Sequence, residues 1–411
     1  MSLIVFRNAA VLDAQAPHRR EGCDVVVEDG TIREVAERPV SLAGATVVDI
    51  GGRTLMPGLI DCHVHVVATM LNLGANAAQP NAIVTLKTVP ILRGMLERGF
   101  TTVRDAGGAD YALALAVESG IVAGPRLFVA GRALSQTGGH GDFRGRWDER
   151  EPCLCCRRAG ALARVADGID GVRKAVREEI KAGAHQIKVM ASGGVASPTD
   201  PIAFFGYSED ELCAIVAEAA AAQTYVMAHA YTPAAISRAV RCGVRTIEHG
   251  NLVDDETARL MAAHGAYAVP TLVTYEALAN EGAALGLPPD SVAKIEGVRK
   301  AGLESLAIFK RAGVKMAFGT DLLGESHVHQ SGEFRIRARV LSPHEVICSA
   351  TGVAAEVLRM EGKLGVVAPG AMADLLVVDG DPLVDIGLLE GQGRHIAAIM
   401  KGGAFVKNRL S

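Results

Sequence analysis

The sequence predicts an α/β fold: a (β/α)8 TIM barrel with a small β-sandwich domain formed from both chain termini. Short apolar runs alternate with helical stretches through the middle of the chain. Runs of β-branched residues, broken by Asp-Gly and Gly-Gly turns, occur at both ends. The length of 411 residues is enough for a large core and a second, smaller domain.

Eight apolar runs in the central region are the candidate barrel strands. Helical stretches separate most of them, and the stretch that begins at Ser208 has Glu211 three residues later, which predicts a capping box. Eight β/α units in roughly 290 residues are somewhat longer than the ~250 residues of a typical TIM barrel. The candidate strands are GLIDCHVHV, FTTVRDA, RLFVAG, HQIKVM, TYVMAHA, VRTIEHG, AYAVPTL and VKMAFGTD.

The β segments at the two ends are predicted to join in one domain, because isolated hairpins are barely stable in water. Two separate hairpins are the less favoured alternative. We expect residues 1–56 and 356–411 to form the β-sandwich domain and residues 57–355 to form the barrel domain.

Composition excludes several classes of function. Hydrophobic residues make up 49% and charged residues 21%, which indicates a globular protein. The net charge of -4, without a basic cluster, argues against nucleic acid or a membrane surface as a partner. The N-terminus lacks the pattern of a signal peptide, and charged residues interrupt each apolar run before it reaches membrane-spanning length. We expect a cytoplasmic homo-oligomer that acts on a small molecule.

The eight cysteines are expected to be free thiols, because the chain is large and shows no secretion signal. Cys153, Cys155 and Cys156 form a cluster, "CLCC". A structural zinc would need further Cys or His at suitable spacing, and none is obvious nearby. We therefore interpret the cluster as loop thiols.

Polar residues at the carboxyl ends of the candidate strands are informative, because catalytic groups of a barrel come from these ends. His63 and His65 are two residues apart and share one face of their strand. Each polar residue alone has a simpler explanation, such as a hydrogen-bonded core histidine, a surface lysine or an aspartate that caps a turn. Together they favour one site, composed of His63, His65, Lys188, His229, His249 and Asp321.

With these residues the sequence resembles the amidohydrolase superfamily in its binuclear, metal-dependent form. The matching pieces are "DCHVH", "IKVMASGG", "AHAYT", "IEHG" and "FGTD", in this order. "MPGLIDCHVH" is similar to the usual entry into that barrel, and "LGVVAPGAMADLLVVDGDP" to the usual exit. Each motif is short, but the ordered set is specific and spans essentially the whole chain.

The resemblance implies two divalent metal ions, with zinc preferred over manganese, cobalt or iron. His63, His65 and Asp321 would bind the more buried ion, and His229 and His249 the more exposed one. Lys188 would bridge the two ions as a carbamate derived from carbon dioxide, because an ammonium cannot ligate a cation. A metal-bridging hydroxide would attack the amide carbonyl, and Asp321 would pass its proton to the leaving amine.

Tyr231 is a second catalytic candidate, because it lies two residues after His229 and could share its face. Its phenol would bind the substrate and stabilise the oxyanion, although a structural tyrosine is an equal alternative. Mononuclear deaminases of the superfamily have a Glu three residues after the fifth-strand His, where this chain has Thr232. They also lack the Lys bridge, so hydrolysis is favoured over deamination.

Within the superfamily the sequence is most similar to Xaa-Pro dipeptidases (prolidases) and their relatives. "SQTGGHGDF", "IKVMASGGVASPTD" and "IEHGNLVDD" carry this likeness. It implies that His140 lies in the substrate pocket; a solvent-facing loop histidine is the alternative. A substrate carboxylate needs a cation, and the loop 135–160 offers Arg144, Arg146, Arg157 and Arg158 beside Trp147.

The predicted function is hydrolysis of the amide bond of dipeptides, Xaa-Pro foremost. The alternative enzyme is a hydrolase of cyclic amides or N-acyl amino acids, similar to imidazolonepropionase or dihydropyrimidinase. A non-catalytic scaffold is disfavoured by the intact ligand set. Glu325 or Glu333 would be candidates if the side-chain pocket were acidic, and His327 and His329 are expected to line the pocket or face solvent without a second metal site.

Overall fold

The computed structural model describes residues 3–145, 147–148, 158–195, 200–284 and 289–410. The CLCC cluster, together with Arg146 and Arg157, lies outside the described residues.

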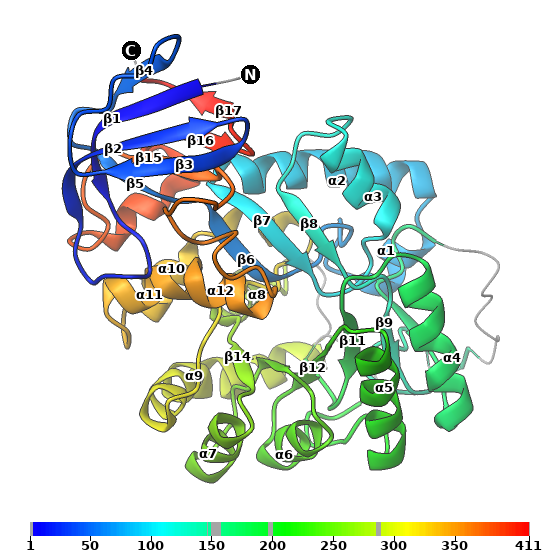
Figure 1. Cartoon of the computed structure of the whole chain (residues 1–411). Coiled ribbons are helices and arrows are strands. Elements are labelled where there is room, and N and C mark those ends of the chain that lie inside the picture. Colours follow the sequence, from blue (N-terminus) through cyan, green and yellow to red (C-terminus); the bar gives the residue numbers. More distant parts are fainter. Residues whose placement is uncertain (1–2, 146, 149–157, 196–199, 285–288, 411) are drawn as a thin grey trace.

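Strands from both ends of the chain form one eight-stranded sheet, which lies beside the central part of the molecule (Figure 1). Its order is β17-β16-β15-β5-β1-β2-β3, with β4 paired to β1. The N-terminal and C-terminal halves meet where β5 and β15 pair antiparallel, with Met56 opposite Leu376. The bounds are β1 Leu3–Val11, β2 Arg20–Glu28, β3 Thr31–Ala36, β4 Thr46–Asp49, β5 Thr54–Pro57, β15 Leu375–Val378, β16 Ile396–Lys401 and β17 Ala404–Asn408.

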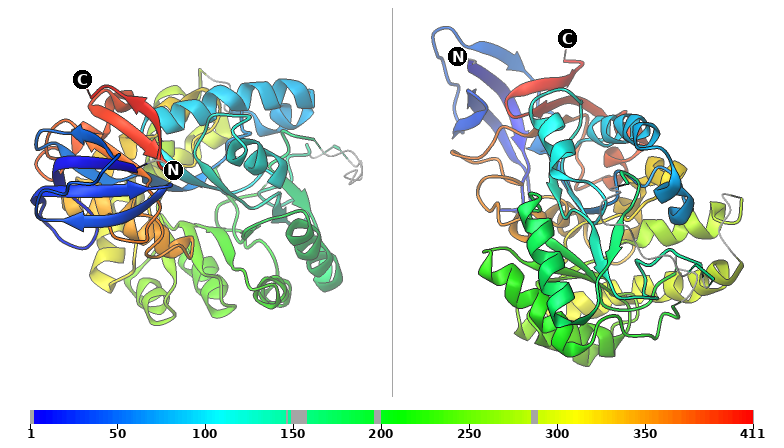
Figure 2. Two further views of the ribbon diagram at one scale, coloured as in Figure 1. Left: turned by 45° about the horizontal axis from the view of Figure 1, so that its top comes forward. Right: turned by 90° about the vertical axis from the view of Figure 1, so that its right-hand side faces the viewer.

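This sheet has its own apolar core, which includes Phe6, Val25, Leu55 and Leu375. Both views of Figure 2 keep the blue N-terminal and the red C-terminal strands side by side. The expectation that the two ends join is confirmed. A sandwich of two facing layers stays a prediction.

The central strands form two parallel sheets, with orders β10-β9-β11-β12-β13-β14 and β6-β7-β8. Seven of the eight predicted strands are present in the described part of the chain, and β9 and β10 are additional short strands. The bounds are β6 Leu59–Val64, β7 Phe100–Asp105, β8 Arg126–Val129, β9 Ala133–Ser135, β10 Ala163–Val165, β11 Ile187–Met190, β12 Val226–Ala230, β13 Thr246–His249 and β14 Tyr267–Val269.

The eighth predicted strand, residues 314–321, is not a regular strand and forms only a parallel bridge between Met316 and Ala268. The described residues contain no single closed sheet of eight strands. The parallel α/β arrangement is therefore confirmed, and closure into a barrel stays a prediction.

Helices cover the outside of the parallel strands (Figure 1). Val172, Ile215 and Ile236 from three of them pack with Val189 and Ile247 of the strands in one apolar cluster. The helices are α1 Leu73–Ala78, α2 Asn81–Glu97, α3 Tyr111–Glu118, α4 Gly168–Lys181, α5 Glu209–Ala221, α6 Pro233–Arg241, α7 Asp255–Ala263, α8 Leu272–Glu281, α9 Pro289–Ala312, α10 Gly332–Arg337, α11 Pro343–Ser349 and α12 Gly352–Val357, with 3-10 turns η1 Gly324–His329, η2 Ile386–Leu389 and η3 Gly391–Gly393.

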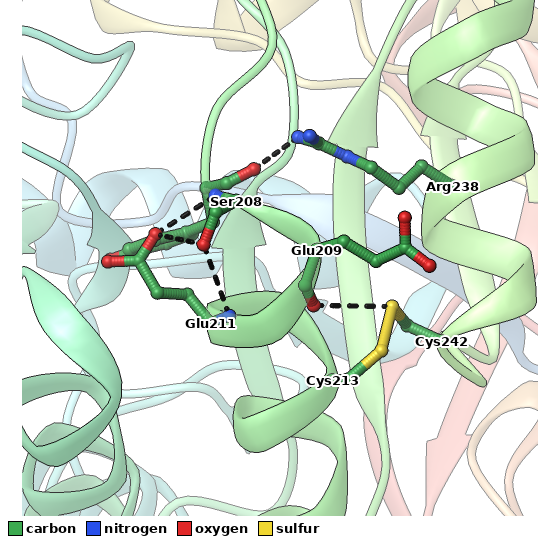
Figure 3. Close-up of a disulfide and its surroundings, with 7 residues drawn as sticks. Ser208, Glu209, Glu211, Cys213, Arg238 and Cys242 are labelled. Atoms are coloured by element: carbon green, nitrogen blue, oxygen red, sulfur yellow. Dashed lines mark hydrogen bonds between the residues drawn. A yellow bond between two sulfur atoms is a disulfide. The ribbon is translucent and has the colours of Figure 1, made fainter.

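The predicted capping box at the start of α5 is confirmed. The backbone N–H of Glu211 donates to the Ser208 hydroxyl at 3.3 Å, and the Ser208 N–H donates to the Glu211 carboxylate at 2.9 Å (Figure 3). None of the described helices is both long enough and apolar enough to cross a bilayer.

The expectation that all cysteines are free thiols is wrong for one pair. Cys213 of α5 and Cys242, directly after α6, form a disulfide (Figure 3). Neighbouring helices bring the two Cα atoms to 4.8 Å although 29 residues separate them in the sequence, and such a pairing depends on packing that spacing does not show. Cys23, Cys62 and Cys348 are free thiols in the described residues.

Candidate active site

The six predicted ligands occupy the carboxyl ends of the parallel strands or the turns that follow them. His63 lies in β6, Lys188 in β11, His229 in β12 and His249 at the end of β13. His65 directly follows β6, and Asp321 is the last residue of the irregular segment 314–321. All are buried except Asp321, which is partly exposed.

Asp321 lies at the centre of this group. Its Oδ1 is 3.3 Å from Nε2 of both His63 and His65, and its Oδ2 is 4.0 Å from Nδ1 of His249. Ligand atoms of His63, His249 and Asp321 all lie within 4.8 Å of one another. This spacing is suitable for a metal ion bound between them.

The tautomers of His63 and His65 show that a cation fits here. Nδ1 of His63 lies 2.6 Å from the Glu248 carboxylate, and Nδ1 of His65 lies 2.8 Å from the carbonyl of Gly107. Both partners only accept hydrogen bonds, so each Nδ1 carries the proton and each Nε2 presents a lone pair. These lone pairs face Asp321, and the buried Nε2 of His63 has no hydrogen-bond partner among the described residues. This arrangement of three acceptors is compatible with a positive ion bound between them.

His229 is oriented by a backbone carbonyl in the same way. Its Nε2 donates to Gly193 O at 3.2 Å, which leaves Nδ1 as the ligating atom. Its ring centroid is 4.7 Å from that of His249. Burial lowers the pKa of both histidines well below the usual value, so both are neutral and competent as ligands.

Lys188 is buried in β11 among these groups. Burial lowers its pKa to about 8, although the negative charges of Glu248 and Asp321 oppose this shift. A neutral amine is the form that reacts with carbon dioxide. Its position is compatible with the predicted carbamate.

The backbone at two of these residues lies in the left-handed region. His249 has φ 71° and Asp321 has φ 52°, each at the point where the chain leaves its strand. Residues with a Cβ rarely adopt this conformation, and such strain is concentrated at functional sites.

His140 and Tyr231 both lie against the candidate ligands. The His140 ring stacks on His229 with centroids 4.2 Å apart, and burial lowers the pKa of His140 to about 3. The Tyr231 ring stacks on His249 at 5.4 Å and meets His229 edge-on at 4.9 Å. His140 is therefore not a solvent-facing loop residue.

The model of the amidohydrolase family matches residues 54–406. The chain belongs to the amidohydrolase family. It is thus an enzyme that hydrolyses carbon–nitrogen bonds.

Several relatives of this amidohydrolase have names or solved structures. Ochratoxinase from Aspergillus niger is 34% identical over 373 residues, which cover 86% of this chain and 75% of the relative. A crystal structure of an amidohydrolase is 64% identical, covers 100% of both chains and has a TM-score of 0.98. A crystal structure of a prolidase complexed with N-methylphosphonate-L-proline is 60% identical, covers 99% of this chain and 100% of that chain, and also has a TM-score of 0.98.

A buried ion pair next to the candidate ligands was not predicted from the sequence. Glu248 of β13 and Arg104 of β7 form an ion pair at 3.0 Å, and both are fully buried. Burial alone would raise the pKa of Glu248, but Arg104 and His63 lower it to about 2. Charged residues inside the apolar runs FTTVRDA and VRTIEHG were the available signal, since a buried strand admits a charge only with a partner.

Other residues considered in the sequence either make local structural contacts or lie exposed on the surface. Thr232, at the position of the deaminase Glu, caps α6 by accepting from the Ala235 N–H at 3.4 Å. Arg144 forms two short hydrogen bonds with Asp142, of 2.8 and 2.7 Å. Arg158 and Trp147 are exposed.

The residues considered for the pocket beyond Asp321 lie in different surroundings. Glu333 is fully buried and ion-paired with Arg337 at 2.7 Å, so it is not available to a substrate, whereas Glu325 is exposed. His327 is buried and its Nε2 donates to Ala68 O at 3.2 Å, so it does not face solvent. His329 pairs with Glu281 at 2.8 Å. Neither belongs to a metal-compatible cluster in the described residues.

Proposed function

We propose that this amidohydrolase is a binuclear metal-dependent hydrolase that cleaves the amide bond of dipeptides, Xaa-Pro foremost. The observation that carries the proposal is the convergence of His63 Nε2, His65 Nε2 and Asp321 Oδ1, three acceptors that a cation would bind. The 60% identity to a prolidase structure supports the dipeptide as the substrate.

The ligand set divides between two sites. His63, His65 and Asp321 would hold one divalent ion, with zinc preferred for this imidazole and carboxylate set. His229 and His249 would hold the second, and Lys188 would bridge them as a carbamate. Two bound ions supply a Lewis acid for the scissile carbonyl and lower the pKa of a water to near 7.

The remaining steps fall to side chains around the ions. Asp321 would take a proton from the attacking water and return it to the leaving nitrogen, for which its partly exposed carboxylate is suitably placed. Tyr231 would donate a hydrogen bond to the developing oxyanion. His140, kept neutral by burial, would orient the scissile group.

We also propose that the parallel strands close into a (β/α)8 barrel of residues 57–355, with residues 1–56 and 356–411 as a composite β-sandwich domain. Backbone hydrogen bonds at both gaps support closure. The His185 N–H donates to Val129 O at 2.8 Å between β8 and β11. On the other side, segment 314–321 accepts from Cys62 of β6 at 2.7 Å and from Ala268 of β14 at 3.0 Å. A cytoplasmic homo-oligomer completes the proposal, and light scattering after gel filtration measures its subunit number.

A second candidate function is hydrolysis of an N-acyl amino acid or a cyclic amide. The 34% identity to ochratoxinase supports this second candidate, because that relative is not named for a dipeptide substrate.

A substrate screen tests the proposal. Protein loaded with zinc, manganese or cobalt in the presence of bicarbonate is assayed with Xaa-Pro dipeptides, other dipeptides, N-acyl amino acids and cyclic amides. We expect the highest kcat/KM for an Xaa-Pro dipeptide. Chelator-treated protein is the control for contaminating activity. Turnover of a cyclic amide with none of any dipeptide would refute the leading proposal.

A further inference from the structure

We propose that Tyr275 is a positioning residue for hydrolysis: it fixes the direction of the Tyr231 hydroxyl so that the Tyr231 proton is left for the substrate. This inference rests on the proposed function, in which Tyr231 donates to a substrate oxygen. Tyr275 belongs to no motif of the sequence and lies in α8, one helix beyond the strands that carry the ligands.

The two phenols form a close buried pair. Their hydroxyl oxygens are 2.7 Å apart, and their ring centroids are 6.3 Å apart at 62°. Tyr231 is 3% and Tyr275 2% exposed. The contacts of Tyr231 with His229 and His249 hold its ring in place, so the remaining freedom of this side chain is rotation of its hydroxyl proton.

One hydrogen bond between two phenols uses one of their two protons, and the surroundings decide which. Thr271 lies one helical turn before Tyr275, and its hydroxyl oxygen is 2.7 Å from Nδ1 of His249. The Thr271 hydroxyl also bonds to the Tyr275 hydroxyl. Since Thr271 Oγ1 accepts from Nδ1 of His249, the Thr271 proton is the one left for Tyr275. Tyr275 then accepts from Thr271 and gives its own proton to Tyr231.

Thr271 is available for this role because another residue caps its helix. Thr271 is the N-cap residue of α8, a position where a threonine usually accepts from the backbone of the first turn, but its side chain makes no such bond. Instead, the carboxylate of Glu333 accepts from the Val273 N–H at 2.7 Å. The Thr271 hydroxyl can thus accept from Nδ1 of His249 and donate to Tyr275.

The result is a series of hydrogen bonds that all donate in one direction, from His249 through Thr271 and Tyr275 to Tyr231. At the first residue of this series, the proton on Nδ1 of His249 leaves a lone pair on Nε2 for the proposed ligand role. At the end, the Tyr231 oxygen is occupied as an acceptor, and its proton is the one group left to donate. Tyr231 would therefore recognise an acceptor, such as a carbonyl oxygen or an oxyanion, rather than a donor.

A double-mutant cycle on the loaded enzyme tests this assignment. In the wild-type background, Tyr275→Phe is expected to lower kcat/KM for the best dipeptide about tenfold, mainly through kcat, as for the loss of one hydrogen bond. In the Tyr231→Phe background the same change is expected to cost less than twofold, because no hydroxyl remains to be directed. Tyr207→Phe is the matched control, since the buried Tyr207 hydroxyl has no partner among the described residues and the change should leave kcat/KM within twofold.

Each outcome is decisive. An equal factor in both backgrounds, or no effect of Tyr275→Phe, overturns the inference. Loss of bound metal in Tyr275→Phe also overturns it, because the effect would then act through the ligands. If Tyr275→Phe does not fold, Thr271→Ser and Thr271→Val replace it: the hydroxyl of Ser should retain activity and Val should lose it. If wild-type protein hydrolyses no dipeptide, the proposed function fails instead.

Discussion

Oε2 of Glu248 accepts a hydrogen bond from Nδ1 of His63 at 2.6 Å, while Arg104 binds the same carboxylate at 3.0 Å. A carboxylate behind a histidine fixes the ring orientation and the tautomer before any metal arrives. Glu248 and Arg104 would thus prepare His63 for its proposed role as a metal ligand.

Glu248→Gln is expected to lower metal affinity by about 10- to 100-fold, as is typical when the partner of a ligating histidine is changed. Competition with a chelator measures this affinity independently of activity. The melting temperature should fall too, because Arg104 loses its charge partner in the interior. Glu296→Gln, at an exposed helix position, is the control. Unchanged metal affinity in Glu248→Gln would show that the pair is only structural.

Asp321→Asn is expected to abolish turnover, because an amide cannot accept the proton of the attacking water. General acid–base groups contribute on the order of 10²- to 10⁴-fold, and the variant also loses a ligand charge. Steady-state kinetics on metal-loaded protein checks the effect. Substantial residual turnover would remove Asp321 from proton transfer.

Lys188→Ala is expected to lower metal content and activity together, because the bridging group is lost. Elemental analysis gives the metal content per chain, and Lys181→Ala, at the exposed end of α4, is the control. Full metal occupancy in Lys188→Ala would rule out the bridge.

Removal of the disulfide is expected to affect stability and not catalysis. Cys213→Ser with Cys242→Ser opens a link across 29 residues, which by loop entropy corresponds to about 3.6 kcal/mol of unfolding free energy. Thermal melting with and without a thiol reductant measures this: the wild type should melt lower when reduced, and the double variant should not respond. If the reductant also lowered the melting temperature of the double variant, the stabilisation would not come from the Cys213–Cys242 disulfide.

The placement of the candidate ligands at strand ends was predictable from sequence because residues at such ends follow a simple rule. In HVH, residues two apart share a face, and the run GLIDC before them marks a buried strand; both are local signals. The second HVH shows the limit of that rule. It lies in η1 rather than at a strand end, and there one histidine is buried against a carbonyl and the other pairs with a glutamate.

Features that depend on packing between distant elements were not predictable. The Tyr231–Tyr275 pair, the capping of α8 by Glu333 and the disulfide all join segments whose proximity only the tertiary structure shows. The eighth strand had the right apolar pattern, but it makes a few backbone hydrogen bonds with β6 and β14 rather than a regular ladder.

The left-handed backbone at His249 and Asp321 means that these positions favour glycine when only folding matters. A side chain costs about 1 kcal/mol in this conformation, which glycine avoids. Asp321→Gly should therefore melt at a higher temperature than Asp321→Ala, although both are inactive. In the proposed function, the molecule retains a less stable backbone at these two positions so that a ligating side chain can face the site. A sequence optimised for thermal stability alone would lose the proposed reactivity at these positions.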